Sequence, residues 1–233
     1  MNALVVSGLN QSYGGSHTLW DVDLVVPAGS RTCLMGRNGM GKTTLLKCIM
    51  GLLPASSVEI DFQGTSLRRL APHERARLGI GYVPQGREIF SHLTVEENLR
   101  IGLGIREHGP KTVPSHIFEL FPVLKEMLRR RGGDLSGGQQ QQLAIARALA
   151  TDPKVLLLDE PTEGIQPNIV QEIERTLRHL NTEMGLTLVL TEQHIKVARS
   201  ISDSFVIMEN GRATRGGPIG GLTDEIVNRH LAI

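Results

Sequence analysis

Aromatic residues, cysteines and long apolar runs are all scarce in this sequence, and each scarcity excludes a class of protein. Aromatics make up 3% of the 233 residues (five Phe, two Tyr and one Trp), so the chain offers few stacking platforms for single-stranded nucleic acid. Its two cysteines, Cys33 and Cys48, make neither a disulfide framework nor a zinc site. The longest apolar runs, such as Val155 to Leu158, fall far short of the roughly 18 residues that a membrane-spanning helix requires.

The sequence also lacks an excess of positive or of negative residues. Lys and Arg total 25 against 24 Asp and Glu, which leaves a formal net charge of +1. Such a balance produces no global field for nucleic acid or an anionic membrane, and we expect no nucleic-acid partner. Met1 to Val6 lack the basic flank and long apolar stretch of a secretory signal. We therefore expect a soluble, cytoplasmic protein with one sizeable core or two modest domains.

Hydrophobic periodicity predicts two kinds of strand. Apolar and polar residues alternate over 22–26 and 58–62, which indicates half-buried antiparallel strands near the N-terminus. Several short apolar runs predict fully buried strands instead, and helical patterns separate the later ones. The runs are 31–35, 155–158, 187–190 and 205–208, and the helical patterns cover 139–150 and 169–183. Strands that alternate with helices predict a covered parallel sheet, and hence an α/β fold.

The middle of the chain has a different character. Residues 86–134 show a helical pattern, with 95–102 and 117–131 as its best segments. Gly104, Gly109-Pro110 and Pro114 punctuate it. We interpret this region as a helical insertion between two halves of the α/β core. Near the end, Thr223 before Asp224 and Glu225 predicts a short capped helix.

The strongest motif is a glycine-rich segment between a predicted strand and a predicted helix. It reads Gly36-Arg37-Asn38-Gly39-Met40-Gly41-Lys42-Thr43, followed by Thr44, and fits the pattern G-x-x-x-x-G-K-[ST]. Its glycines let backbone N–H groups wrap closely around phosphate oxygens, and the positive end of the following helix adds to the attraction. Lys42 is predicted to contact the β- and γ-phosphates, and the Thr43 hydroxyl to bind Mg²⁺. An ordinary glycine turn is the alternative.

A pair of carboxylates follows the buried run 155–158. Asp159 and Glu160 stand where this strand ends, which is where open α/β sheets bind their ligands. We predict that Asp159 holds Mg²⁺ and that Glu160 polarises or positions the water that attacks the γ-phosphate. Without the phosphate motif the same pair would indicate only a solvated strand end.

A third motif, Leu135-Ser136-Gly137-Gly138-Gln139, opens a helix. Ser136 is a good N-cap, and the two glycines leave backbone N–H groups accessible to an anion. In its sequence and its position before Asp159, the motif resembles the signature of ABC ATPases, the nucleotide-binding subunits of ATP-binding-cassette transporters. The resemblance covers essentially the whole chain. It implies an α/β P-loop NTPase with a RecA-like core, an antiparallel β subdomain and an inserted α-helical subdomain.

The resemblance also implies boundaries and further site residues. It implies a single ATPase domain over 1–233, with the core in 1–85 and 135–233 and the helical subdomain in 86–134. Tyr13 matches the aromatic that stacks on adenine, with a buried strand tyrosine as the alternative. Gln85 matches the glutamine that contacts Mg²⁺ and the attacking water. Pro161 to Pro167 matches the segment that helps to pair two subunits, and Ser136 to Gln139 of one subunit would bind the ATP of the other.

One position departs from the family pattern. Members usually carry a histidine after the strand predicted at 187–190, where it contacts the γ-phosphate, but this chain reads Thr191-Glu192-Gln193-His194. When that strand and Ser202-Asp203 are taken as anchors, Gln193 falls at the position of this histidine, called here the switch position. His194 then lies one residue beyond it. Adjacent residues that leave a strand point in opposite directions. We favour Gln193 as the third catalytic residue beside Glu160 and Gln85, and His194 stays open.

Finer resemblance points to a group of importers. Four segments resemble ATPases that serve branched-chain amino acids, or urea and short amides, with the urea branch favoured. They are the glycine-rich motif around Met40, Gln85 to Phe90, Pro161 to Pro167 and the pair Glu192-Gln193. The resemblance implies ATP and Mg²⁺ as cofactors. It also implies a second ATPase subunit, identical or paralogous, two membrane permeases that place the chain on the inner face of the membrane, and indirectly a substrate-binding protein. An ATPase of lipid or lipopolysaccharide export, a soluble non-transport ABC ATPase and a small-molecule P-loop kinase are the alternatives.

Overall fold

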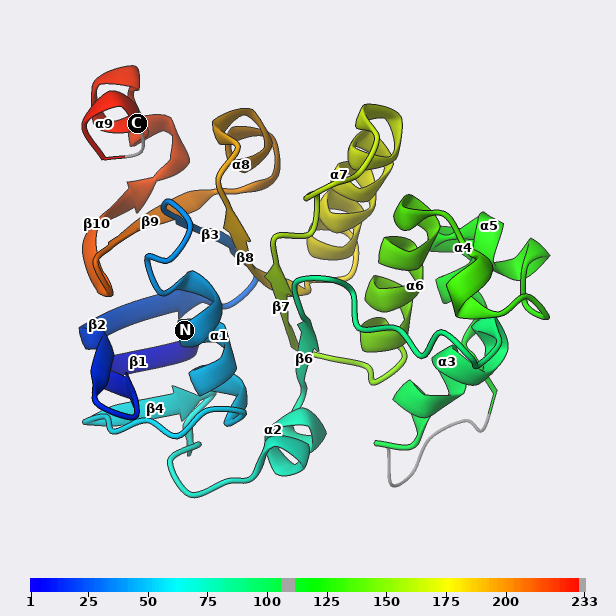
Figure 1. The fold of residues 1–233 in the computed structure, drawn as a ribbon, viewed down its shortest axis with the longest axis horizontal. Coiled ribbons are helices and arrows are strands. Elements are labelled where there is room, and N and C mark those ends of the chain that lie inside the picture. The colour runs from blue at the N-terminus through cyan, green and yellow to red at the C-terminus, as the bar shows by residue number, and fades with distance from the viewer. Residues whose placement is uncertain (106–111, 231–233) are drawn as a thin grey trace.

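The strands of this protein form two sheets of different construction (Figure 1). The computed structural model describes residues 1–105 and 112–230, so the predicted break at Gly109-Pro110 lies outside the described residues. A four-stranded antiparallel sheet has the order β2-β1-β4-β5, and a six-stranded sheet has the order β10-β9-β3-β8-β7-β6. In the larger sheet β9, β3, β8, β7 and β6 run parallel, and β10 runs antiparallel to β9.

The strands of the antiparallel sheet are β1 (Asn2–Tyr13), β2 (Ser16–Pro27), β4 (Glu59–Phe62) and β5 (Thr65–Ser66). Those of the larger sheet are β3 (Arg31–Met35), β6 (Ile80–Val83), β7 (Val155–Asp159), β8 (Thr187–Glu192), β9 (Ser204–Glu209) and β10 (Arg212–Pro218). The α-helices are α1 (Lys42–Met50), α2 (Pro72–Leu78), α3 (Val95–Leu103), α4 (Ser115–Leu120), α5 (Pro122–Glu126), α6 (Gly137–Leu149), α7 (Pro167–Thr182), α8 (Ile195–Ile201) and α9 (Asp224–His230). Short 3-10 turns cover η1 (Gly132–Asp134) and η2 (Ile219–Gly221).

The parallel sheet is buried on both faces, as its continuous apolar strands predict. Side chains alternate between the faces of a strand. Leu157 of β7 therefore joins a cluster with α1 and the antiparallel sheet. Leu156 and Leu158 join a second cluster with α6, α7 and α8 on the other face. Helix α1, which directly follows the glycine-rich motif, is thus packed between the two sheets.

The predicted helical region lies to one side of the sheets, beyond α6 (Figure 1). Helix α3 begins at a capping box, in which the Thr94 hydroxyl accepts from the Glu97 N–H and the Glu97 carboxylate accepts from the Thr94 N–H. The buried Asn98 amide donates to the carbonyls of Phe90, Leu93 and Thr94. This side chain fixes the loop before α3 against the helix.

The prediction of one helix over 117–131 is wrong. The structure has two short helices there, α4 and α5, and the second ends at Glu126. The break falls at Phe121, whose backbone leaves the helical region at φ −132° and ψ 72°. Proline disfavours the α conformation in the residue before it, so Pro122 can begin α5 but cannot continue α4.

The other predicted elements are confirmed, with changes at their ends. Strand β3 has the predicted bounds, and α9 begins at Asp224. Strand β8 runs two residues beyond its apolar run, because Thr191 and Glu192 still pair with Leu34 and Met35 of β3. Within 1–105 and 112–230, none of the helices combines the length and the apolar character needed to cross a membrane.

A buried arginine holds the C-terminal end of α1. The Arg75 side chain, 6% exposed, donates to the carbonyl oxygens of Cys48 and Ile49 at 2.9 and 2.7 Å and to that of Leu70 at 2.9 Å. The last carbonyls of a helix have no partner within the helix. Arg75 therefore ties α2 to the end of the helix that follows the phosphate motif.

We expect Arg75→Ala to lower the free energy of unfolding by about 2–4 kcal/mol, because it removes the three hydrogen bonds of the guanidinium and opens a cavity. Urea unfolding followed by circular dichroism measures the change. The exposed Arg69→Ala on the preceding loop is the control, and its effect should stay within about 0.5 kcal/mol. Equal stability of the two variants would contradict the role given to Arg75.

Candidate functional site

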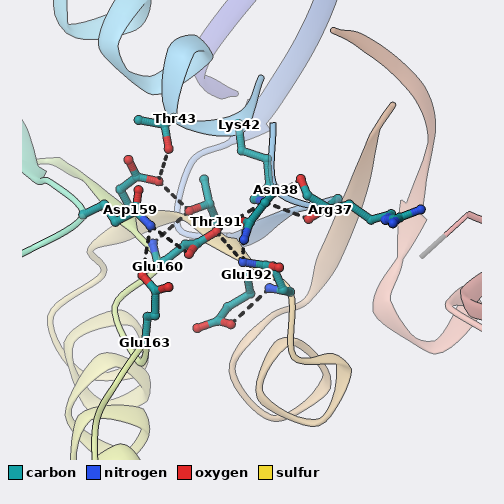
Figure 2. A network of polar contacts seen from close by, with 12 residues as sticks. Arg37, Asn38, Lys42, Thr43, Asp159, Glu160, Glu163, Thr191 and Glu192 are labelled. Carbon is teal, nitrogen blue, oxygen red and sulfur yellow. Dashed lines mark hydrogen bonds and ion pairs between the residues drawn. The ribbon is translucent and has the colours of Figure 1, made fainter. Parts of the chain in front are cut away.

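Four parallel strands end at the same edge of the larger sheet, and a predicted site residue follows each. The glycine-rich loop follows β3, Gln85 follows β6 after one proline, Glu160 follows β7 and Gln193 follows β8. Because parallel strands bring their carboxyl ends together, residues far apart in sequence meet here. Figure 2 shows Asn38 and Lys42 of the glycine-rich motif close to Glu160 in one network of polar contacts.

Two glycines of the loop occupy positions where a side chain does not fit. A Cβ on Gly36 would lie 2.5 Å from the carbonyl oxygen of Met208, on the neighbouring strand β9. Gly41 has φ 98°, in the left-handed region, and a Cβ there would lie 2.6 Å from Leu19. The loop therefore passes close to β9 and β2 before it turns into α1.

Lys42 begins α1 and is almost fully buried, at 4% exposure. Its Nζ donates to the carbonyl oxygens of Gly36 and Arg37 at 2.7 and 3.2 Å. The same nitrogen lies 3.3 Å from Glu160 Oε1, and both side chains of this ion pair are buried. The loop carbonyls and a carboxylate thus hold the ammonium where the loop would receive an anion.

Asp159, the last residue of β7, is held from several sides. Its Oδ1 accepts from the hydroxyls of Thr43 at 3.1 Å and Thr191 at 2.7 Å. Its Oδ2 accepts from the Tyr82 hydroxyl at 3.4 Å. Burial and the neighbouring Asp159 charge raise the pKa of Tyr82, so this phenol stays a neutral donor.

The Thr43 and Asp159 oxygens fit a magnesium site. They lie 3.1 Å apart at the start of α1, and such hard oxygen donors suit Mg²⁺, which keeps several waters and takes phosphate oxygens as further ligands. No group of three or more His, Cys, Asp or Glu side chains able to hold a metal occurs in the described parts of the chain. Gln85, also predicted to contact the metal, donates from its amide nitrogen to Glu160 and Glu163.

Glu160 stands at the centre of the network and is 8% exposed. Its backbone is left-handed, with φ 47°, a conformation that is costly for a residue with a side chain. The Glu160 N–H donates to the Thr191 hydroxyl at 2.8 Å, which helps to hold that turn. Its carboxylate accepts from the amide groups of Gln85 at 3.2 Å and Gln193 at 2.9 Å. The structure thus brings the three predicted catalytic residues together.

Gln193 and His194 occupy different surroundings, as adjacent residues at a strand end should. The Gln193 amide also donates to Asn38 Oδ1 of the glycine-rich loop at 2.7 Å. His194 is exposed and lies just before α8 as its N-cap. This geometry favours Gln193 for the switch position, and its role in the reaction remains a prediction.

The signature segment forms a regular helix start. Ser136 caps α6 by accepting from the Gln139 N–H, and the Gln139 side chain accepts from the Ser136 N–H at 3.0 Å. A Cβ on Gly138 would lie 2.8 Å from Ile169 of α7. Among the described residues, no hydrogen bond or ion pair joins residues 136–139 to the loop 36–44. Ser136 is exposed and residues 137–139 are partly exposed.

The remaining predicted residues line the same region or lie at its border. Tyr13, at the end of β1, is half exposed, so it is not the buried strand tyrosine of the alternative. Met40 Sδ accepts from the Asn210 N–H, which anchors the loop to the turn after β9. Gly39 has φ 79°, and Thr44 is buried in α1.

Several residues in and beside this network were not predicted. Thr191 bridges Asp159 and Glu160, and Glu163 accepts from Gln85 at 2.9 Å. Arg87, with φ 72°, places its guanidinium beside Gly137, where a Cβ would lie 3.0 Å from its Nη1. Polar residues directly after a buried strand were the available signal for Thr191. The contacts of Arg87 depend on loop geometry that the sequence pattern does not record.

The comparisons with known proteins agree with this geometry. The family model described as ABC transporter matches residues 19–163, more than half of the chain. The chain is 43% identical to the high-affinity branched-chain amino acid transport ATP-binding protein BraG of Pseudomonas aeruginosa, covering 86% of each chain. It is 38% identical to a probable branched-chain amino acid transport ATP-binding protein, LivF, of Archaeoglobus fulgidus, covering 93% of this chain and 92% of that one.

A solved structure shows the same fold. It is a dimeric post-hydrolysis state of the ATP-binding cassette MJ0796 bound to ADP and Pi, with a TM-score of 0.84 and 27% identity over 93% of this chain and 98% of that one. The α/β P-loop NTPase fold predicted from the sequence is confirmed. From the motifs, their convergence at one sheet edge and these similarities, we conclude that the chain belongs to the ABC transporter family and is one of its ATP-hydrolysing cassettes.

Proposed function

We propose that this chain powers the uptake of branched-chain amino acids through separate membrane permeases. The observation that carries the proposal is its similarity to two branched-chain amino acid transport ATP-binding proteins over nearly their whole lengths. Sulfate/thiosulfate import ATP-binding proteins reach 38% identity as well, and this chain spans 61% of their length. Identity alone therefore supports the importer more strongly than it supports the substrate.

Urea or short amides are a second candidate substrate class. The segment Glu163-Gly164-Ile165-Gln166-Pro167 and the P-loop residue Met40 favour it by resemblance. None of these side chains has to touch the transported molecule, since transport takes place in other chains. The two candidates therefore share one catalytic mechanism and differ only in their partners.

The proposed reaction begins with an exchange of partners at Lys42. Its ammonium is held by loop carbonyls and by Glu160, and ATP offers β- and γ-phosphate oxygens in their place. Half-exposed Tyr13 is then available to stack on the adenine ring. Thr43 and Asp159 would hold Mg²⁺, which supplies charge stabilisation to the phosphates when bound.

Hydrolysis of ATP requires the protein to position the attacking water and requires little covalent chemistry from its side chains. Glu160, released from Lys42, is placed to accept a proton from that water or to orient it. Gln85 and Gln193 already donate to its carboxylate, so both amides lie within reach of a water beside it. Gln193 also donates to Asn38 of the P-loop, and this contact supports a role for its amide beside the phosphate.

Two subunits are proposed to share each ATP. Ser136, Gly137 and Gly138 begin α6, whose positive end favours an anion, and they make no hydrogen bond to the P-loop of their own chain within the described residues. The similar cassette of known structure is dimeric. ATP bound between two such faces would join them, and its hydrolysis would release them.

The loop and helix around 88–98, with half-exposed Phe90, form the proposed contact with the permease on the inner face of the membrane.

We expect Gln193→Ala to lower the kcat of ATP hydrolysis by about tenfold or more, since it removes a donor at the reacting phosphate. His194→Ala should stay within about threefold of the parent chain, because this side chain is exposed. Steady-state ATPase assays of the two variants measure the difference. A larger loss in His194→Ala would reverse the assignment.

We expect Glu160→Gln to bind ATP, to hydrolyse it slowly and to accumulate an ATP-bound dimer. Adding Ser136→Arg to this variant should abolish the dimer while ATP still binds, because the arginine fills the space before α6. Size-exclusion chromatography with ATP tests this, with the exposed Ser66→Arg on β5 as the matched control. Normal dimers with Ser136→Arg would argue against ATP sharing.

The substrate is tested by transport in cells that lack this chain. The parent chain should restore uptake of radiolabelled leucine, and Glu160→Gln, which still binds ATP, should not. Urea uptake is measured in the same cells. Restored urea uptake without restored leucine uptake would favour the second candidate, and no restoration of either would contradict both.

A further inference from the structure

A buried carboxylate at the end of β8 has no part in the mechanism described so far. Glu192 is 2% exposed. Its Oε1 accepts from the Thr162 hydroxyl at 2.5 Å, and its Oε2 accepts from the backbone N–H groups of Gln193 and His194 at 3.2 and 3.4 Å. These hydrogen-bond partners of the Glu192 side chain all lie in loops, and none lies in the sheet.

The surroundings of Glu192 are unusual for a charged side chain. No lysine, arginine or histidine forms an ion pair with it in the described parts of the chain. Burial raises the pKa of this carboxyl, against the opposing effects of its hydrogen bonds and of the neighbouring His194. A buried polar group without such bonds is costly, and an apolar residue would fill the space at less cost. The hydrogen bonds to the two loops are therefore what distinguishes Glu192 from another core residue.

The two loops joined by Glu192 carry the groups around the reacting phosphate. Thr162 stands two residues after Glu160 and one before Glu163, which holds Gln85. Gln193 contacts both Glu160 and Asn38. The preceding Thr191 points the opposite way and holds Asp159 and the backbone of Glu160. Figure 2 shows Glu192 below this network and Thr191 within it.

We propose that Glu192 is a positioning residue for ATP hydrolysis. Its carboxylate holds the loop after Glu160, through Thr162, in register with the loop that carries Gln193. The proposal rests on the catalytic roles proposed above for Glu160 and Gln193. Glu192 does not meet ATP itself, so it acts on the rate of hydrolysis and not on the binding of nucleotide. Movement of residues 161–164 would reach Gln193 through this contact.

Substitutions at Glu192 and Thr162 can show whether the contact depends on hydrogen bonding or on the charge of the carboxylate. Glu192→Ala removes both acceptors, and Thr162→Val removes the hydroxyl at nearly constant volume. Glu192→Gln keeps an oxygen that accepts from the backbone N–H groups and adds an amide that donates to the Thr162 oxygen. The glutamine variant should therefore preserve the link between the loops.

Thr187→Val provides a matched control. Thr187 begins the same strand and is also 2% exposed, and its hydroxyl accepts from the Gly29 N–H at 2.9 Å at the far end of the sheet. Loss of this hydroxyl removes a partly buried hydrogen bond without touching the site. If Thr162 were only structural, Thr162→Val and Thr187→Val would change the midpoint of thermal unfolding similarly and leave kcat unchanged.

The experiment measures kcat and KM for ATP, binding of a fluorescent ATP analogue and thermal unfolding in the full-length chain. We expect Glu192→Ala and Thr162→Val each to lower kcat by about tenfold, with KM and analogue affinity within about twofold, because misplaced groups slow the reaction. Glu192→Gln should keep kcat within about threefold. The double variant should be no slower than the slower single variant, since both remove one contact.

Three results would overturn the proposal: kcat losses no larger than that of Thr187→Val, additive losses in the double variant, or a Glu192→Gln variant as slow as Glu192→Ala. If Glu192→Ala does not fold, Thr162→Val and Glu192→Gln still decide the question. Glu160→Gln and Gln193→Ala are assayed alongside. If these two lose activity while Thr162→Val does not, the positioning role fails and the proposed catalytic roles stand.

Discussion

The parallel pairing of β3, β8, β7 and β6 is the constraint on which the site depends. It brings Lys42, Gln193, Glu160 and Gln85 to one edge of the sheet, although they are spread over more than 150 positions of the chain. Both faces of the sheet are packed, by α1 and the antiparallel sheet on one side and by α6, α7 and α8 on the other. The strand ends are therefore fixed, and the loops need to supply only local geometry.

Within this frame one buried ion pair is proposed to link nucleotide binding to hydrolysis. Lys42 holds Glu160 at 3.3 Å, and both are shielded from solvent. A buried ion pair is strongly destabilised when one partner leaves, unless another charge takes its place. In the proposed mechanism the phosphates of ATP would provide that charge for Lys42, and Gln85 and Gln193 would remain on Glu160 as neutral donors. Occupation of the P-loop would therefore change the surroundings of the carboxylate that is proposed to act on water.

The sequence predicted those parts of the fold and site that depend on local pattern. Apolar runs located β3 and β7, and the glycine and lysine spacing located the P-loop, because close backbone approach permits few residues there. The break at Phe121 was missed although Pro122 signals it, since the apolar pattern continues through both helices. The contacts of Thr191, Arg87 and Glu192 could not be predicted, because each joins segments that only tertiary folding brings together.

The central claim is that Lys42 leaves Glu160 to bind the phosphates of ATP. The most direct measurement is the affinity of Lys42→Ala for ATP, compared with the parent chain in the presence of Mg²⁺. Loss of one charge-assisted contact, at about 1.5–3 kcal/mol, predicts an affinity weaker by roughly tenfold or more. An unchanged ATP affinity in Lys42→Ala would contradict the claim.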